Sequence, residues 1–151
     1  INKSAVEKTQ SFVADAINKG GEILTGGKPM GECFYEPTVI GNASREMNFT
    51  EDEIFGPVAP LYKFNTDAEA IEMANDTIYG LASYFYSESV SRCWKVAEAL
   101  EYGMVGINEG LVSTEVAPFG GVKFSGQGRE GSKYGIEDYL EIKYMCFGNI
   151  I

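Results

Sequence analysis

The chain has 151 residues, contains no histidine, and carries 12 basic against 22 acidic side chains, a net charge of −10. Without imidazole it cannot build a Ser-His-Asp or Cys-His catalytic group or a histidine-based zinc site. The acidic balance argues against nucleic acid and anionic membranes as partners, because both attract basic surfaces.

The cysteines Cys33, Cys93 and Cys146 lie far apart, without the spacing of metal ligands. We therefore expect no metal site and predict that each is a small buried hydrophobic residue. Unpaired thiols suit a reducing compartment, which indicates a cytoplasmic protein. No run of about 18 apolar residues would span a membrane. The chain opens at Ile1, in a helical pattern and without the features of a signal peptide, which hints at a fragment.

The first part of the chain predicts one helix and two extended segments. Apolar spacing favours a helix over residues 3–19, opened by a capping box that starts at Ser4. Residues 22–25 read as a short strand that ends at a Gly-Gly turn. Residues 35–40 look extended, and Pro37 makes them an edge strand or the start of a strand, because proline cannot donate to a ladder.

Strands and helices alternate through the middle of the chain. Strands are predicted over residues 58–64, 81–86 and 104–108, with a helix opened by a capping box at Thr66 and another over residues 89–101. The second of these helices is expected to bury Val90, Cys93, Trp94, Ala97 and Leu100. This order is typical of a parallel α/β sheet, in which ligand sites form at the strand ends.

The last part of the chain is rich in glycine and then apolar. Residues 118–131 hold five glycines in 14 positions and predict an ordered loop. A short helical turn is expected over residues 132–137, followed by a long terminal strand over residues 139–147. This terminal strand is expected to favour association, because an apolar strand with unpaired edges can add to the sheet of another subunit.

Two phosphate-binding patterns overlap the glycine-rich loop, and neither is well supported. Residues 126–131 match GxGxxG, but that fingerprint requires a preceding apolar strand, and a turn-rich stretch precedes it here. Residues 121–126 have the outer spacing of a P-loop, but Gln127 stands where the phosphate-binding lysine is required. The favoured interpretation is that the glycines permit positive φ and close approach of the chain.

Two loops carry side chains suited to a ligand. In the turn of residues 53–57, Glu53 offers a carboxylate that accepts from two vicinal ribose hydroxyls, and Phe55 offers a ring for a flat heterocycle. A solvated acidic turn beside a packing phenylalanine is the alternative. Ser113 follows the strand over residues 104–108 and is placed to orient a carboxylate or carbonyl, although loop serines commonly contact solvent only.

Several motifs together resemble the carboxy-terminal part of the NAD(P)-dependent aldehyde dehydrogenase superfamily. They are the sequence EIFGP at residues 53–57, PFGGVKFSG at residues 118–126 and GRE at residues 128–130. Residues 98–110 and 131–144 are similar to one branch, the succinate-semialdehyde dehydrogenases. The likeness covers essentially the whole chain and implies the fold, activity and cofactor of that branch. It makes residues 1–138 the carboxy-terminal part of the catalytic domain, in its parallel-sheet half, and residues 139–151 an oligomerisation strand and tail.

The resemblance implies a role for five residues. Glu53 would bind the nicotinamide ribose hydroxyls of NAD or NADP, and Phe55 would pack near the nicotinamide. Ser113 would contact the substrate carboxylate, and Phe119 would line the aldehyde pocket. Glu130 would relay a proton away from the general base.

In the family a cysteine thiolate adds to the aldehyde, hydride passes to the nicotinamide, and a water activated by glutamate hydrolyses the thioester. The resemblance places the nucleophile, the base and the cofactor-binding domain upstream of this chain. The parent protein is thus expected to be a homo-oligomeric oxidoreductase, a dimer or tetramer, that oxidises succinate semialdehyde or a related short ω-carboxylated aldehyde. The chain alone is expected to be inactive. The alternative is a non-catalytic fragment that retains only association and partial ligand-pocket surfaces.

Overall fold

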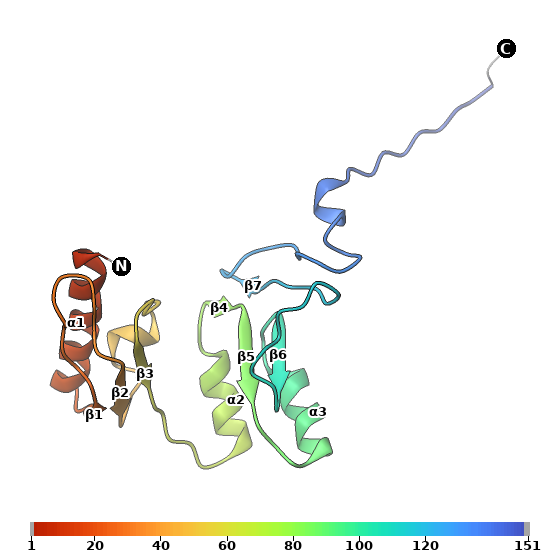
Figure 1. Ribbon diagram of the computed structural model, residues 1–151. Helices are drawn as coiled ribbons and strands as arrows, with labels where there is room; N and C mark the ends of the chain where they lie inside the picture. Colours follow the sequence, from red (N-terminus) through yellow and green to blue (C-terminus); the bar gives the residue numbers. More distant parts are fainter. Residues whose placement is uncertain (1, 150–151) are drawn as a thin grey trace. The chain divides into compact units, whose positions relative to one another are not determined.

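The computed structural model describes residues 2–149, and the chain divides into two compact units, Ile1–Glu72 and Met73–Ile151 (Figure 1). We refer to them as the first unit and the second unit. None of the helices within residues 2–149 combines the length and the apolar character that crossing a bilayer requires.

Helix α1 (Lys3–Asn18) confirms the first predicted helix but not its predicted cap. The side chain of Asn2 accepts from the Ala5 N–H at 2.9 Å, so Asn2 is the N-cap and Ser4 lies inside the first turn. At the other end Gly20 adopts φ 89°, and the Gly21 N–H donates to the Ala16 carbonyl at 2.7 Å. This left-handed residue satisfies a terminal carbonyl and ends the helix.

The first unit contains a sheet in the order β1-β2-β3, formed by β1 (Glu22–Thr25), β2 (Thr38–Gly41) and β3 (Val58–Pro60). Strand β1 pairs antiparallel with β2, and β2 pairs parallel with β3. The strand predicted near Pro37 starts directly after that proline, but it is the central strand and not an edge. Strand β3 is shorter than predicted and ends at Pro60, which has no N–H to donate.

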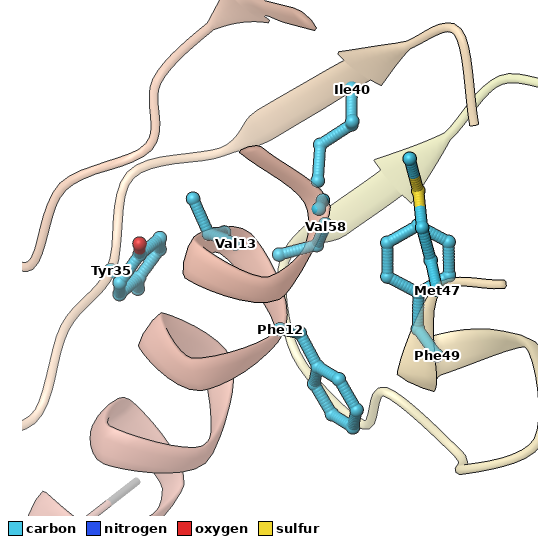
Figure 2. Close-up of a cluster of buried hydrophobic side chains, with 8 residues drawn as sticks. Phe12, Val13, Tyr35, Ile40, Met47, Phe49 and Val58 are labelled. Carbon is cyan, nitrogen blue, oxygen red and sulfur yellow. The ribbon is translucent and has the colours of Figure 1, made fainter. Parts of the chain in front are cut away.

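The core of the first unit lies between α1 and this sheet. Figure 2 shows Val13 of α1 directed towards the strands that carry Ile40 and Val58. Val13 and Ile40 are 1% and 0% exposed. The Phe12 and Phe49 rings lie 6.5 Å apart between centroids, at an angle of 60°. Burial of each such side chain contributes about 1.5–3 kcal/mol, so this contact layer holds α1 on the sheet.

Asp15 ties α1 to the short 3-10 helix η1 (Asn48–Thr50). Its carboxylate forms an ion pair with Lys19 at 2.8 Å and accepts from the Asn48 N–H at 2.8 Å. The Lys19 ammonium also donates to the Asn48 side-chain oxygen at 3.0 Å. The hydrogen bond from Lys19 and then that from Asn48 lower the pKa of Asp15.

The second unit contains a βαβ arrangement of β5 (Ala82–Phe85), α3 (Val90–Ala99) and β6 (Met104–Ile107), in which β5 and β6 pair in parallel (Figure 1). These elements confirm the predicted strands and helix, with Ser89 as the N-cap of α3. The predicted buried face of α3 is only partly covered, because Val90 and Trp94 are 73% and 68% exposed.

Helix α2 (Asp67–Asn75) runs across the boundary between the units and begins at the predicted capping box. The Glu69 N–H donates to the Thr66 hydroxyl at 3.1 Å. In return the Glu69 carboxylate accepts from the Asn65 N–H at 2.7 Å. One backbone N–H in the first turn of α2 and one just before the helix are therefore satisfied by the side chains of the capping box.

The end of α2 is fixed by a group that we call the Lys123 cluster, consisting of Asn75, Thr77, Glu101, Tyr102 and Lys123. The Lys123 ammonium donates to the carbonyls of Asn75 at 3.0 Å and Thr77 at 3.2 Å. It also forms an ion pair with Glu101 at 2.6 Å. A cation at the last carbonyls of a helix complements the helix dipole.

Two further side chains of the Lys123 cluster join the ends of α2 and α3. The Asn75 amide donates to the Ala99 carbonyl at 2.7 Å and accepts from the Glu101 N–H at 2.9 Å. The Tyr102 hydroxyl donates to the Ala74 carbonyl at 2.6 Å. Burial raises the pKa of Tyr102, which keeps this donor protonated.

Lys123 lies in β7 (Val122–Lys123), which pairs antiparallel with β4 (Tyr79–Gly80). The architecture is therefore a mixed α/β fold, and the predicted single parallel sheet is not confirmed. The parallel pairs β2–β3 and β5–β6 lie in separate sheets, each beside its own helix, and two antiparallel pairs accompany them.

The predicted terminal strand over residues 139–147 is not confirmed either. Turns over residues 132–136 lead into a 3-10 helix, η2 (Glu137–Tyr139), and the chain then runs extended through residue 149 without a strand (Figure 1). Every described residue of this tail is exposed, and Ile142 is fully so. An apolar alternation becomes a strand only when another strand pairs with it.

Acid should weaken the first unit through Asp15. Because the folded-state pKa lies below the ordinary 3.8, the stabilisation is complete above that value and is lost as pH falls through the lowered pKa. Denaturant titrations in this acid range should show a falling free energy of unfolding, and Asp15→Asn should flatten that dependence. Asp52→Asn, at an exposed position in the same unit, is the control, and an equal flattening there would contradict the assignment.

Lys123→Gln should destabilise the second unit by about 1–3 kcal/mol, because two carbonyls lose a charged donor. Urea unfolding followed by circular dichroism would measure the loss. Lys95→Gln removes the same charge from an exposed position on α3 and should be nearly neutral. Equal effects of the two variants would show that net charge, and not the cluster, is responsible.

Candidate functional site

The turn of residues 53–57 is held against α1 by two contacts. The Lys8 ammonium donates to the Glu53 carbonyl at 2.8 Å. Gly56 lies against the buried Thr9, since a Cβ at this glycine would come within 2.7 Å of the Thr9 hydroxyl. Between these contacts Phe55 adopts φ 42°, an uncommon value for a residue with a side chain.

This geometry displays the two side chains that the sequence analysis selected. The Phe55 ring is 77% exposed and borders a shallow groove of ≈ 550 Å³, whose walls include Val6, Phe34, Tyr35 and Pro57. The Glu53 carboxylate is exposed and bonds to no other residue in the described chain. The turn can therefore offer an acceptor with open lone pairs beside an aromatic face.

The glycine-rich loop of the second unit brings Phe119 and Glu130 together. They form an antiparallel bridge in which the Phe119 N–H donates to the Glu130 carbonyl at 2.9 Å and the Glu130 N–H donates back at 2.7 Å. Residues directly opposite each other in such a pair project from the same face. Phe119 is half-buried and Glu130 is exposed.

Arg129 braces this loop from within. One guanidinium nitrogen donates to the carbonyls of Gly121 at 2.8 Å and Gly128 at 2.7 Å. The Arg129 N–H donates to the carboxylate of Asp138 at 3.1 Å. Gly128 has φ 77°, a conformation that residues with a side chain rarely adopt, so glycine is favoured there.

Ser113 lies in the irregular segment that follows β6. Asn108, directly after β6, adopts φ 55°. Its side-chain oxygen accepts from the Ser87 N–H at 2.8 Å, and its side-chain amide donates to the Ser87 carbonyl at 2.8 Å. Ser113 itself is exposed and forms no hydrogen bond with any described residue. The structure thus pairs Phe119 with Glu130 but does not join Ser113 to them.

The structure gives the glycines of the loop a conformational role. Gly126, Gly128 and Gly131 all have positive φ, at 131°, 77° and 63°. The segment after them contains turns and a 3-10 helix, not the helix that a dinucleotide fingerprint opens, so the GxGxxG reading is not supported. Lys123, the lysine within this loop, donates to the carbonyl of Asn75, the last residue of α2.

The residues that hold the candidate site in place were not predicted from the sequence. These residues act through backbone carbonyls or close packing, and they are Lys8, Thr9 and Arg129. Such contacts produce no spacing pattern in the amino-acid sequence. The prediction of buried cysteines was wrong for Cys33 and Cys146, which are exposed, while Cys93 is half-buried. Within residues 2–149 no group of three or more metal-ligating side chains could hold an ion.

Comparison with known proteins gives a consistent result. The mitochondrial succinate-semialdehyde dehydrogenase of Oryza sativa is 59% identical over 152 residues, which cover 99% of this chain and 29% of that protein. The glutarate-semialdehyde dehydrogenase of Pseudomonas aeruginosa is 57% identical over 99% of this chain and 32% of its own length. The crystal structure of an NADP dependent enzyme from Escherichia coli superimposes with a TM-score of 0.94 at 54% identity, covering 99% of this chain and 31% of that one.

The chain spans less than a third of the length of these three proteins. The match to the family described as the aldehyde dehydrogenase family nevertheless extends over residues 1–145. By sequence and by fold, the chain belongs to the aldehyde dehydrogenase family.

Proposed function

We propose that this chain is the carboxy-terminal part of an NAD(P)-dependent aldehyde dehydrogenase that oxidises succinate semialdehyde, or a related short ω-carboxylated aldehyde, to the acid. The observation that carries the proposal is the identity of 57–59% with two semialdehyde dehydrogenases over nearly the whole chain. The names of these two relatives refer to substrates of one class, an aldehyde with a carboxylate at its other end. The two relatives therefore support the class of the substrate more strongly than the length of its carbon chain.

The turn of residues 53–57 fits the nicotinamide end of such a cofactor. Glu53 has open lone pairs for the ribose hydroxyls, and the exposed Phe55 ring offers a face for the nicotinamide. The bound cofactor would accept the hydride that leaves the substrate. The role of this chain would be to hold the ribose and the nicotinamide ring. The contacts of Lys8 and Thr9 keep the turn in the conformation that this role requires.

In the second unit, Ser113 would donate to the substrate carboxylate and Phe119 would form part of the aldehyde pocket. A hydroxyl without another partner is free to orient towards such an anion. Glu130 would accept a proton from the general base and pass it on, consistent with an exposed carboxylate fixed through its backbone to Phe119. The nucleophilic cysteine and the base would lie in the part of the relatives that this chain does not span.

Residues 139–151 would form the oligomerisation segment, with residues 1–138 belonging to the catalytic domain. The described part of this tail is exposed and carries large apolar side chains, including Tyr144 and Phe147. Such a segment gains its missing backbone bonds by adding to the sheet of another subunit, which supports a homo-oligomer and a strand in the assembly. The predicted cytoplasmic location stays a prediction, since the rice relative is named as mitochondrial.

Ser113→Ala in the full-length protein should lower kcat/KM for succinate semialdehyde roughly tenfold, because a hydrogen bond to a charged group is lost. A neutral aldehyde of equal length should be affected much less. Initial rates of nucleotide reduction would give both values, with Ser91→Ala as a matched exposed control and the 151-residue chain alone as an inactive reference. Equal losses for the two aldehydes would remove the assigned role.

Glu53→Gln should raise the KM for NAD or NADP about tenfold while the KM for the aldehyde changes little, because the neutral amide is a weaker acceptor. Steady-state kinetics with each substrate varied in turn would separate the two constants. Glu51→Gln makes the same change at a neighbouring exposed position and should leave both near the wild-type values. An equal rise of the cofactor KM in Glu51→Gln and Glu53→Gln would indicate a general charge effect.

A further inference from the structure

We propose that Arg129 is the positioning residue of the glycine-rich loop, and that it fixes Phe119 and Glu130 so that the substrate wall and the proton acceptor share one face. The inference deepens the proposed function and rests on it. It concerns a residue that is assigned no contact with substrate or cofactor and that acts only through Phe119 and Glu130.

The Arg129 side chain joins the two arms of the loop. Gly121 belongs to the outgoing arm and Gly128 to the returning arm, and one guanidinium nitrogen donates to both carbonyls at 2.8 and 2.7 Å. The Arg129 stem also packs over Gly120, where an added Cβ would approach its Cδ atom to 3.0 Å. We call these two hydrogen bonds from the guanidinium the Arg129 brace. The brace spans the loop next to the Phe119–Glu130 bridge.

The backbone of Arg129 is held from a second direction. Its N–H donates to Asp138 of η2 at 3.1 Å, so the side chain and main chain of one residue tie three segments together. Glu130 is the next residue, and its own N–H and carbonyl are both used in the bridge to Phe119. The backbone from which the Glu130 carboxylate projects is thus held on both sides of its Cα.

The composition of the loop makes this brace necessary. Four of its glycines, Gly120, Gly126, Gly128 and Gly131, adopt positive φ and contribute no side chain. Glycine has the largest conformational freedom to lose, so a loop built from it needs fixed contacts to hold one shape. Without the guanidinium, the bridge between Phe119 and Glu130 is expected to open more often.

The effect on turnover should fall on one step. In the proposed reaction, hydride transfer precedes thioester hydrolysis, and Glu130 serves the hydrolysis by removing the proton that the general base takes from water. Loss of Arg129 should therefore slow hydrolysis while the first hydride transfer proceeds. In pre-steady-state kinetics, the burst of reduced nucleotide should keep its amplitude while the steady rate falls.

The test compares Arg129→Gln, Arg129→Lys and Lys133→Gln in the full-length protein. Arg129→Gln should lower the steady rate about tenfold with the burst retained, and should speed amide hydrogen exchange at residues 119 and 130 by a similar factor. Arg129→Lys should recover part of both effects, because an ammonium can also donate to two carbonyls. Lys133→Gln removes the same charge nearby and should change neither.

Three outcomes would overturn the inference. Unchanged exchange in Arg129→Gln would show that no brace exists. Faster exchange with an unchanged steady rate would show that the brace has no part in turnover. A burst and a steady rate that fall together would show that Arg129 does not act selectively on the hydrolysis step. If the wild-type protein oxidises no semialdehyde, the proposed function fails, while hydrogen exchange still decides whether the brace is present.

Discussion

The ammonium of Lys123 is the contact on which the second unit depends. It sits where three pieces of chain meet, at the end of α2, at the turn that follows α3, and at the start of the glycine-rich loop. Each of its three donors has an acceptor, so a single side chain satisfies the carbonyls of Asn75 and Thr77 and the Glu101 carboxylate at once. Its backbone φ of 55° shows that the loop accepts an unfavourable conformation to place it there.

The two candidate ligand regions follow the same physical scheme. In each, glycine or positive-φ backbone shapes a turn, and a cation fixes that turn through carbonyl oxygens. Lys8 does so for the turn that carries Glu53 and Phe55, and Arg129 for the loop that carries Phe119 and Glu130. Because the cations bind backbone, the residues that would face a ligand keep their own functional groups free.

The parts of the fold that the sequence predicts are those governed by local rules. The capping box at Thr66 and the apolar runs of β5 and β6 depend on neighbours a few positions away, and the structure confirms them. The exposed side chain of Trp94 was not predictable, since periodicity marks an apolar face but does not reveal what covers it. For the same reason the tail reads as a strand in the sequence and has no partner in the described chain.

The candidate site likewise has features that the sequence predicts and features that it does not. Motif resemblance selects Glu53, Phe55, Ser113, Phe119 and Glu130, and their roles remain proposals. The bridge between Phe119 and Glu130 was not predicted, because it forms between two stretches with no strand pattern and is set by the brace between them. Positive φ at Phe55 likewise has no signature in the sequence, since its causes lie on another element.

Because the backbone of Phe55 is strained, substitutions outside the turn can change the conformation of the turn. A non-glycine residue in the left-handed region costs of order 1–3 kcal/mol and persists only where its surroundings over-determine it. Here those surroundings are Lys8 and Thr9, on the helix beneath the turn. Display of the aromatic ring is thus a property of α1 as much as of the turn. Substitutions along that helix that never reach a ligand can release the strain and let the ring turn away.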